Sequence, residues 1–237
     1  MPVITEEEMK MALGRLKAKK TAPGPDGIPG KVLSIALEFL SNDLRELFDQ
    51  CLSTGQFPKI WKEGRLCLLR KEGRPLDSPS AYRPIVLLNE TGKILEKIIA
   101  ARLNQHLEEV GPGLSEAQFG FRAGRSTIDA LNALKTRALA ATSQGEVLLA
   151  VSIDVVNAFN SLPFETLREA IRYHGVPLYL RRLLNDYLED RVVSWTGGDG
   201  QIGRRRVACG VPQGSVLGPV LWNLGYDGSY VVAYPPG

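Results

Sequence analysis

The sequence has little cysteine and histidine and no long apolar run. Its three cysteines and two histidines are spread over 237 residues. Neither a zinc-ligand spacing nor a disulfide framework is present, so we expect reduced core cysteines, and we assign no chemistry to the histidines, His106 and His174. No run approaches the roughly 18 apolar residues of a membrane span, and the N-terminus has no signal-peptide pattern. These absences predict an intracellular protein with no membrane partner.

Two phosphate-binding patterns are also absent. The chain has no GxGxxG segment after a strand and no GxxxxGK[ST] loop, which excludes a Rossmann-like or P-loop enzyme. The net charge of +3 is small, but basic residues gather in three clusters, within 59–74, 122–125 and 204–206. Such clusters can converge into one positive groove for a phosphate backbone, and each can equally be a solvated face.

Hydrophobic periodicity and turn residues divide the chain into helices and short strands. The first predicted helix, over 4–17, starts with a capping box of Thr5 and Glu8, with Ile4 and Met9 at hydrophobic-staple positions. An ordered, proline- and glycine-rich loop follows over 19–30. Further helices are predicted over 31–52 (interrupted near Ser41), 89–110 (capped by Asn89), 128–141 (capped by Ser126), 165–173 and 178–188. Strands are predicted over 65–69 and 82–88, and a hairpin over 191–195 and 205–209, so the fold class is α+β.

One apolar run ends on a carboxylate. The segment Val147–Ile153 is rich in β-branched residues and leucine, and Asp154 follows it directly. Such a run predicts a strand buried on both faces, where an acid is costly unless it has a partner. On the local pattern alone, Asp154 is either the cap of a turn or a metal-binding or catalytic carboxylate.

Five sequence blocks together resemble a known family. They are APGPDGIPG, YRPIVLLNETGKILEKIIAARL, SEAQFGFRAGRSTIDAL, SIDVVNAFNSL and CGVPQGSVLGPVLWN, in this order. The chain resembles the reverse transcriptase region of a non-LTR (LINE-type) retrotransposon, most like the group that inserts into ribosomal DNA of arthropods. The resemblance implies a right-hand polymerase fold with fingers over 1–145, a partial palm over 146–227 and no thumb. Residues 228–237 form an atypical tail.

The resemblance implies RNA-directed DNA polymerase activity with two Mg²⁺ ions, which clamp the attacking and leaving oxygens of nucleotidyl transfer. It makes Asp154 the first catalytic and metal-binding aspartate, with help from the backbone carbonyl of Val155. Phe159 matches the aromatic residue under the incoming sugar, where a rigid ring clashes with a 2′-OH. The implied partners are an RNA template, a DNA primer or target and deoxynucleoside triphosphates.

Other nucleotide and template contacts follow from the same resemblance. Gln213, Gly214 and Ser215 match the turn that lies against the nucleotide and the template. Arg83 and Lys71 match finger residues that hold the triphosphate, although Arg70 stands where the family usually has a proline. Two further residues are assigned to the template, with salt bridges on the helix lead-in as the alternative: Arg122 and Arg125.

The sequence departs from the family at its second carboxylate source. The family has an aromatic-X-Asp-Asp block after the glutamine–glycine turn, whereas this chain has no Asp-Asp dipeptide, and Asp227 matches a non-catalytic position. We therefore expect this chain to be inactive alone. The alternative is a non-catalytic nucleic-acid-binding relic or an adopted reverse transcriptase fold. The resemblance further implies a larger polyprotein with an endonuclease and a nuclear location for target-primed insertion.

Overall fold

The computed structural model describes residues 2–14, 16, 22–75, 77–155 and 157–233, with the backbone alone over 228–233. The helices are α1 (Glu6–Leu13), α2 (Gly30–Thr54), α3 (Lys59–Lys62), α4 (Glu90–Glu109), α5 (Thr127–Ser143), α6 (Ala158–Ser161), α7 (Phe164–Tyr173), α8 (Leu178–Leu188) and α9 (Gly218–Ala233). The strands are β1 (Glu63–Arg70), β2 (Tyr82–Leu87), β3 (Val192–Thr196) and β4 (Ile202–Arg206), with a 3₁₀ turn at Pro79–Ala81. Within this described part, no helix is both long and apolar enough to cross a membrane.

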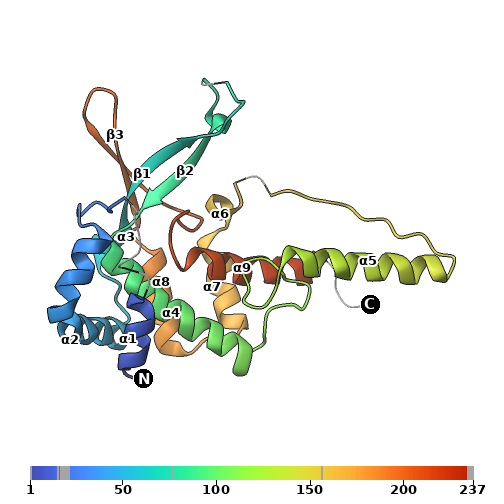
Figure 1. The fold of residues 1–237 in the computed structure, drawn as a ribbon, viewed down its shortest axis with the longest axis horizontal. Coiled ribbons are helices and arrows are strands. Elements are labelled where there is room, and N and C mark those ends of the chain that lie inside the picture. The colour runs from blue at the N-terminus through green and yellow to red at the C-terminus, as the bar shows by residue number, and fades with distance from the viewer. Residues whose placement is uncertain (1, 15, 17–21, 76, 156, 234–237) are drawn as a thin grey trace.

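The strands form a sheet of order β2-β1-β3-β4 that rises from a helical body (Figure 1). Strands β1 and β2 pair antiparallel, as do β3 and β4, while β1 and β3 pair parallel with Arg65 opposite Ser194. Pro84 lies in β2, an edge strand, where its missing N–H is tolerated. The four predicted strands and the predicted hairpin are present, but the last strand spans Ile202–Arg206 and not 205–209. The strands join across more than 100 residues into one sheet.

Helix α4 lies at the centre of the helical body. The apolar face predicted for it is confirmed, because Ile94, Leu95, Ile98, Ile99 and Leu103 are each at most 2% exposed. These side chains share one core cluster with residues of α1, α2, α8 and α9. Burial of aliphatic side chains contributes about 1.5–3 kcal/mol each, so these residues of α4 contribute a large share of the apolar stabilisation of the body.

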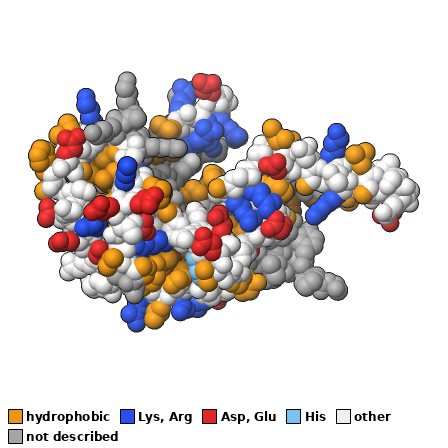
Figure 2. Space-filling model, turned by 60° about the horizontal axis from the view of Figure 1, so that its bottom comes forward, with side chains coloured by type: hydrophobic (Ala, Val, Ile, Leu, Met, Phe, Trp, Pro, Cys, Tyr) orange, Lys and Arg blue, Asp and Glu red, His pale blue; other side chains and the backbone are white. Residues whose placement is uncertain are grey.

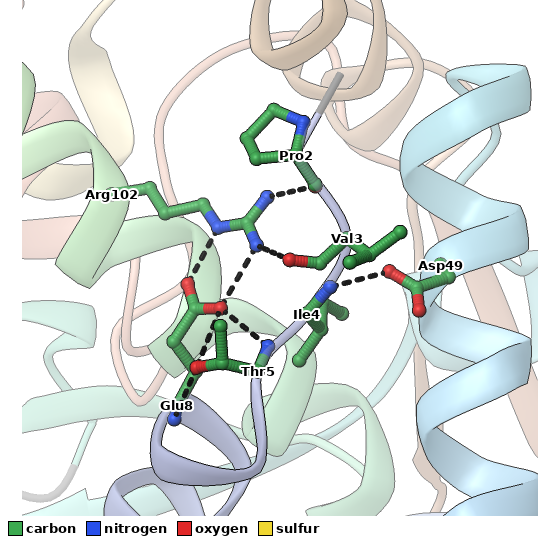
Figure 3. Close-up of polar contacts among 7 residues, drawn as sticks. All are labelled: Pro2, Val3, Ile4, Thr5, Glu8, Asp49 and Arg102. Atoms are coloured by element: carbon green, nitrogen blue, oxygen red, sulfur yellow. Dashed lines mark hydrogen bonds and ion pairs between the residues drawn. The ribbon is translucent and has the colours of Figure 1, made fainter.

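The N-terminal segment is fastened to α4 by one arginine (Figure 3). Arg102 Nε and Nη2 donate to the two carboxylate oxygens of Glu8 at 2.6 and 2.9 Å, and its Nη1 and Nη2 donate to the carbonyls of Pro2 and Val3. The hydrogen bond from Arg102 is the main cause that lowers the pKa of Glu8. Glu8 also completes the predicted capping box with Thr5, which is confirmed.

Two details of the predicted helices are wrong. Helix α2 runs without interruption through Ser41, because its buried stripe of Leu37, Leu44 and Phe48 continues on both sides of this residue. Asn89 stands at the start of α4, but its side chain makes no capping bond. Its amide group instead accepts from the N–H of Asp26 and donates to the carbonyl of Ile60, which ties the loop before α2 to α4.

The predicted buried strand before Asp154 is wrong. Residues 147–153 are extended but belong to no strand, and Val147, Leu149 and Ile153 are 94, 84 and 81% exposed. This segment returns from the far end of α5, which projects from the body and has no buried residue (Figure 1). An apolar run indicates that a segment tends to be buried, but it does not show that another strand is available to pair with it. No strand in the described part of the chain pairs with this run.

The three cysteines differ in burial. Cys51 is buried in α2, as expected, and burial raises the pKa of its thiol to about 11. Cys67 is half-buried in β1, whereas Cys209 is exposed, so the expectation of a core position is wrong for Cys209. Its thiol donates to the carbonyl of Asn160 at 3.3 Å, at the point where β4 leads into the turn before α9.

Candidate functional site

The turn before α9, Gly210–Ser215, is joined by backbone hydrogen bonds to the segment that follows Asp154. The N–H of Val211 donates to the carbonyl of Phe159 at 2.6 Å, and the N–H of Gly210 donates to the carbonyl of Leu162 at 2.7 Å. Gly210 has a φ of +77°, and a Cβ atom there would meet the carbonyl oxygen of Phe159 at 2.5 Å. Only glycine allows this close approach, and it brings together two blocks that lie about 50 residues apart.

The same turn closes the outer edge of β2. The N–H of Val86 donates to the carbonyl of Gln213 at 2.9 Å. Gly214 has a φ of +127°, and a Cβ atom there would lie 2.6 Å from the carbonyl oxygen of Val86. Within the described residues, no hydrogen bond to the side-chain amide of Gln213 is found. The turn thus lies directly against the strand that carries Arg83, with a polar side chain available to a ligand.

Phe159 belongs to an aromatic cluster. The ring of Phe159 contacts those of Phe121 and Trp222, each with a centroid distance of 5.7 Å. Phe121 has a φ of +52°, a backbone conformation that is rare for a bulky residue. Hydrogen bonds between Asn223 of α9 and the carbonyls of Gly120 and Phe121 hold it there. Residues 119–121 (FGF) therefore form part of this site through Phe121, although the sequence had not assigned them to it.

The two basic residues predicted to hold a triphosphate lie on the β1–β2 hairpin. Lys71 directly follows β1, where its N–H donates to the carbonyl of Ala81 and its ammonium group to that of Ser80. Arg83 is exposed in β2 opposite Leu69. Figure 2 shows basic side chains gathered around the tip of this hairpin, above the body. The hairpin therefore carries positive charge along the strand whose Val86 is bonded to the turn.

The other two predicted template residues are occupied by protein groups. Arg122 donates to the carbonyls of Leu114 and Ser115, the latter at 2.9 Å. Arg125 forms an ion pair with Glu116 and lies over the ring of Phe119. These contacts order the segment before α5, and only Arg125 has the salt bridge named as the alternative; the template role of both residues stays a prediction. Ser215 also has a structural contact, because its hydroxyl accepts from the N–H of Gly218 at 2.8 Å and caps α9.

Two of the three basic clusters converge on the sheet. Between loop residues 25–26 and the β3–β4 hairpin lies a cavity of about 430 Å³ that is lined by Arg65, Trp195 and Arg204, among others. Arg204 pairs with Glu63 at 3.4 Å, and Trp195 is 38% exposed. Exposed guanidinium groups next to an aromatic ring suit a single nucleic-acid strand, because phosphates and bases both find partners there.

The position of Asp154 does not form a metal site with other acidic residues in the described part of the chain. Asp154 and Val155 are both exposed, and no group of three or more His, Cys, Asp or Glu side chains is placed to hold an ion among those residues. Mg²⁺ prefers several carboxylate or phosphate oxygens in a near-octahedral arrangement. Asp154 and Val155 alone do not complete the coordination of such an ion.

A buried carboxylate that sequence reasoning missed lies behind the turn. Glu96 of α4 is 1% exposed, and its Oε2 accepts from the N–H groups of Val216 and Leu217 at 2.6 and 3.3 Å. Its Oε1 accepts from the hydroxyl of Tyr187 at 3.2 Å. Burial is the main cause that raises the pKa of Glu96, and the nearby charge of Arg191 opposes this. Its only sequence signal was a single acid between the apolar pairs Ile94–Leu95 and Ile98–Ile99, next to Lys97.

The histidines have structural contacts, and so has Asp227. His106 Nε2 bonds the carbonyl of His174, and His174 Nδ1 bonds that of Pro112 at 2.6 Å. Both rings are buried. Asp227 is 5% exposed and accepts from the N–H of Ser115. These contacts fasten the ends of α4 and α7 to α9, and the non-catalytic position expected for Asp227 agrees with them.

Comparison with protein families assigns the chain that carries this turn, the aromatic cluster and the basic hairpin to one class. A family described as reverse transcriptase (RNA-dependent DNA polymerase) matches residues 69–229, and the chain belongs to this family. Its fold is a reverse transcriptase domain with mixed α and β content around a four-stranded mixed sheet.

The curated proteins that are similar to this chain include proteins of transposable elements, among them retrotransposons. The chain is 34% identical over 227 residues to a probable RNA-directed DNA polymerase from transposon BS of Drosophila melanogaster, across 93% of this chain and 24% of that protein. It is 33% identical to the RNA-directed DNA polymerase from mobile element jockey of the same species, across 94% of this chain and 24% of that protein. It is 34% identical to a Pol polyprotein from type-1 retrotransposable element R1 of Bradysia coprophila, across 94% of this chain and 22% of that protein.

The resemblance to non-LTR retrotransposon reverse transcriptases is therefore confirmed. Both R1 and R2 elements are among the relatives, the R2 element of Popillia japonica at 28% identity. The chain spans about a quarter of the length of the first relatives named above.

Proposed function

We propose that residues 1–237 form the nucleotide- and template-holding part of a retrotransposon RNA-directed DNA polymerase. Fingers over 1–145 and a partial palm over 146–227 make up this part. RNA template, DNA primer or target and deoxynucleoside triphosphates are its partners. Phe159 faces the incoming sugar, Arg83 and Lys71 hold the triphosphate, and Gln213 and Gly214 lie against the nucleotide.

One observation carries this proposal. The Gly210–Ser215 turn is bonded on one side to the backbone of Phe159 and on the other side to that of Val86 in β2. Three blocks that the chain keeps far apart thus meet through main-chain bonds at this turn, which carries Gln213, and Arg83 lies three residues before Val86 in the same strand. An aromatic face and a charged fork are the groups that a sugar and a triphosphate require.

The nucleotide part of the proposal predicts that Arg83→Ala raises the Kd of dTTP about 10- to 100-fold, because a charge-assisted contact to phosphate is lost. The measurement is equilibrium dialysis of the whole chain with labelled dTTP in MgCl₂. Arg70→Ala is the matched control. Arg70 lies opposite Tyr82 and Arg83 opposite Leu69, so the two guanidinium groups start from opposite faces of one hairpin. Equal losses in both variants would show only a diffuse charge effect and contradict the assignment.

The catalytic part of the proposal makes Asp154 one ligand of a Mg²⁺ pair in the whole enzyme, with the carbonyl of Val155. The sequence has no Asp-Asp dipeptide, and among the described residues Asp154 belongs to no group of three or more His, Cys, Asp or Glu side chains that could hold an ion. We therefore expect no primer extension on an RNA template by this chain. Extension assays with labelled dTTP check this prediction. Sustained synthesis that Asp154→Ala abolishes would refute it.

A non-catalytic role is the second candidate, and the exposed, unaccompanied Asp154 favours it. In this role the fold only holds RNA, through template residues that include Arg122, Arg125 and Ser215. Salt-dependent binding of an RNA hairpin without dTTP binding would support it. The names of the R1 and R2 relatives as Pol polyproteins support a larger polyprotein around this part; that this polyprotein includes an endonuclease belongs to the proposal. Target-primed insertion would place the enzyme in the nucleus.

A further inference from the structure

Glu96 is a buried acid in the apolar core, a position where an acid is rare unless it has a structural or functional role. It lies in the middle of α4 between Leu95 and Ile98, two residues of the apolar core. A buried carboxylate is costly unless hydrogen bonds and an opposite charge compensate it. Its compensation comes entirely from other elements: Tyr187 of α8, Arg191 before β3 and the residues that open α9.

The carboxylate is directed at the N–H groups that lead into α9. Val216 and Leu217 immediately precede the helix, and their N–H groups point to Oε2 of Glu96. Glu96 accepts from both and adds negative charge at the positive end of the helix dipole. It thus acts as a cap supplied from another helix, 120 residues away in the chain.

This cap fixes the downstream side of the turn. Ser215 donates its N–H to the carbonyl of Pro212, so the turn is a closed unit of four residues that ends next to Val216. On the upstream side, the turn is held by Val86 and Phe159 through main-chain bonds. Besides the bonds to Glu96, the downstream side is held by the N–H of Gly218, which donates to the hydroxyl of Ser215 at 2.8 Å. Without Glu96, this short-range bond alone would fasten that side.

We propose that Glu96 is a positioning residue that holds the Pro212–Ser215 turn in the geometry needed to contact a nucleotide. It does not touch the nucleotide itself. Tyr187 orients the carboxylate through its hydroxyl, and Arg191 supplies the compensating charge. The inference rests on the proposed nucleotide-binding role of the turn, but its structural part can be measured without any ligand.

The test compares Glu96→Gln, which keeps one acceptor oxygen, and Glu96→Ala, which keeps none, in the whole chain. Glu90→Gln is the matched control, because Glu90 is a buried carboxylate on the same helix that pairs with Lys93 at 2.9 Å. Hydrogen exchange of residues 212–218 is the first readout. We expect at least tenfold faster exchange there in Glu96→Ala, a smaller increase in Glu96→Gln, and no local change in the control.

Equal exchange of this segment in the control and the Glu96 variants would overturn the inference, whatever their thermal stability. If Glu96→Ala fails to fold, the comparison of Glu96→Gln with Glu90→Gln decides alone. The Kd of dTTP is the second readout, with Gln213→Ala beside it. If Gln213→Ala weakens binding and the Glu96 variants do not, positioning is refuted. If neither Gln213→Ala nor Arg83→Ala affects binding, the proposed function fails, and faster local exchange still establishes Glu96 as the cap.

Discussion

Replacement of Gly210 by alanine is expected to lower the free energy of unfolding by about 3–4 kcal/mol, since two costs add. The φ of +77° is strained for any residue with a Cβ atom. The added Cβ would also lie 2.5 Å from both the carbonyl oxygen of Phe159 and the Cα of Asn160. These are backbone atoms and cannot rotate away. Urea unfolding followed by circular dichroism measures the loss.

Gly124→Ala is the matched control for this prediction. Gly124 has a similar φ of +70°, but a Cβ atom there would meet nothing within 4 Å. Its substitution should therefore cost only the conformational strain, about 1 kcal/mol. The difference between the two variants isolates the close approach of the turn to the Phe159 segment. Equal losses would mean that this approach is looser than the structure has it.

Local patterns along the chain were enough to place most helices and strands. The capping boxes of Thr5 with Glu8 and Ser126 with Asp129 are both formed, because each depends on residues three positions apart. Elements that depend on distant partners were less predictable. Asn89 has the residue type of a cap, but Asp26, 63 residues away, takes its side-chain oxygen. The exposed segment 147–153 shows the same limit, because hydrophobicity does not specify which strand is its neighbour.

The candidate site divides in the same way. Resemblance to a family indicated Gln213, Gly214, Phe159 and Arg83, and the structure brings their segments together through main-chain bonds. Whether these residues bind a nucleotide stays a prediction. Glu96 could not be found in this manner, because its hydrogen-bonding partners lie 91 to 121 residues further along the chain. A charged residue inside an apolar helical stretch indicates that it has a buried polar partner. Which residue is that partner can be seen only in the folded structure.

Replacement of Arg191 by methionine is expected to cost about 3 kcal/mol at neutral pH, because it leaves a buried carboxylate without a compensating charge. Arg191 is 1% exposed, its Nη1 donates to the carbonyl of Tyr187 at 3.2 Å, and its guanidinium group lies 4.4 Å from the centre of that ring. Methionine can fill the volume but supplies neither the charge nor the hydrogen bond. Urea unfolding between pH 4.5 and 7.5 measures the free energy of unfolding.

The cost of Arg191→Met should also depend on pH. Burial raises the pKa of Glu96 above its ordinary 4.5 while Arg191 lowers it, so the substitution raises this pKa further. A pKa raised in the folded state favours the folded form at low pH, where Glu96 is protonated, and this advantage is lost as the pH rises through the folded value. The loss of stability should therefore be smallest near pH 4.5 and grow towards neutrality.

The double variant Glu96→Gln with Arg191→Met is the control for this charge effect. It removes both charges, so we expect it to recover much of the stability lost in Arg191→Met and to show no increase of the loss with pH. The amide oxygen of glutamine can still accept from Val216, whose N–H lies 2.6 Å from Oε2 in the unmodified protein. A loss in Arg191→Met that stays constant with pH would show that packing, and not the charge of Glu96, makes this arginine necessary.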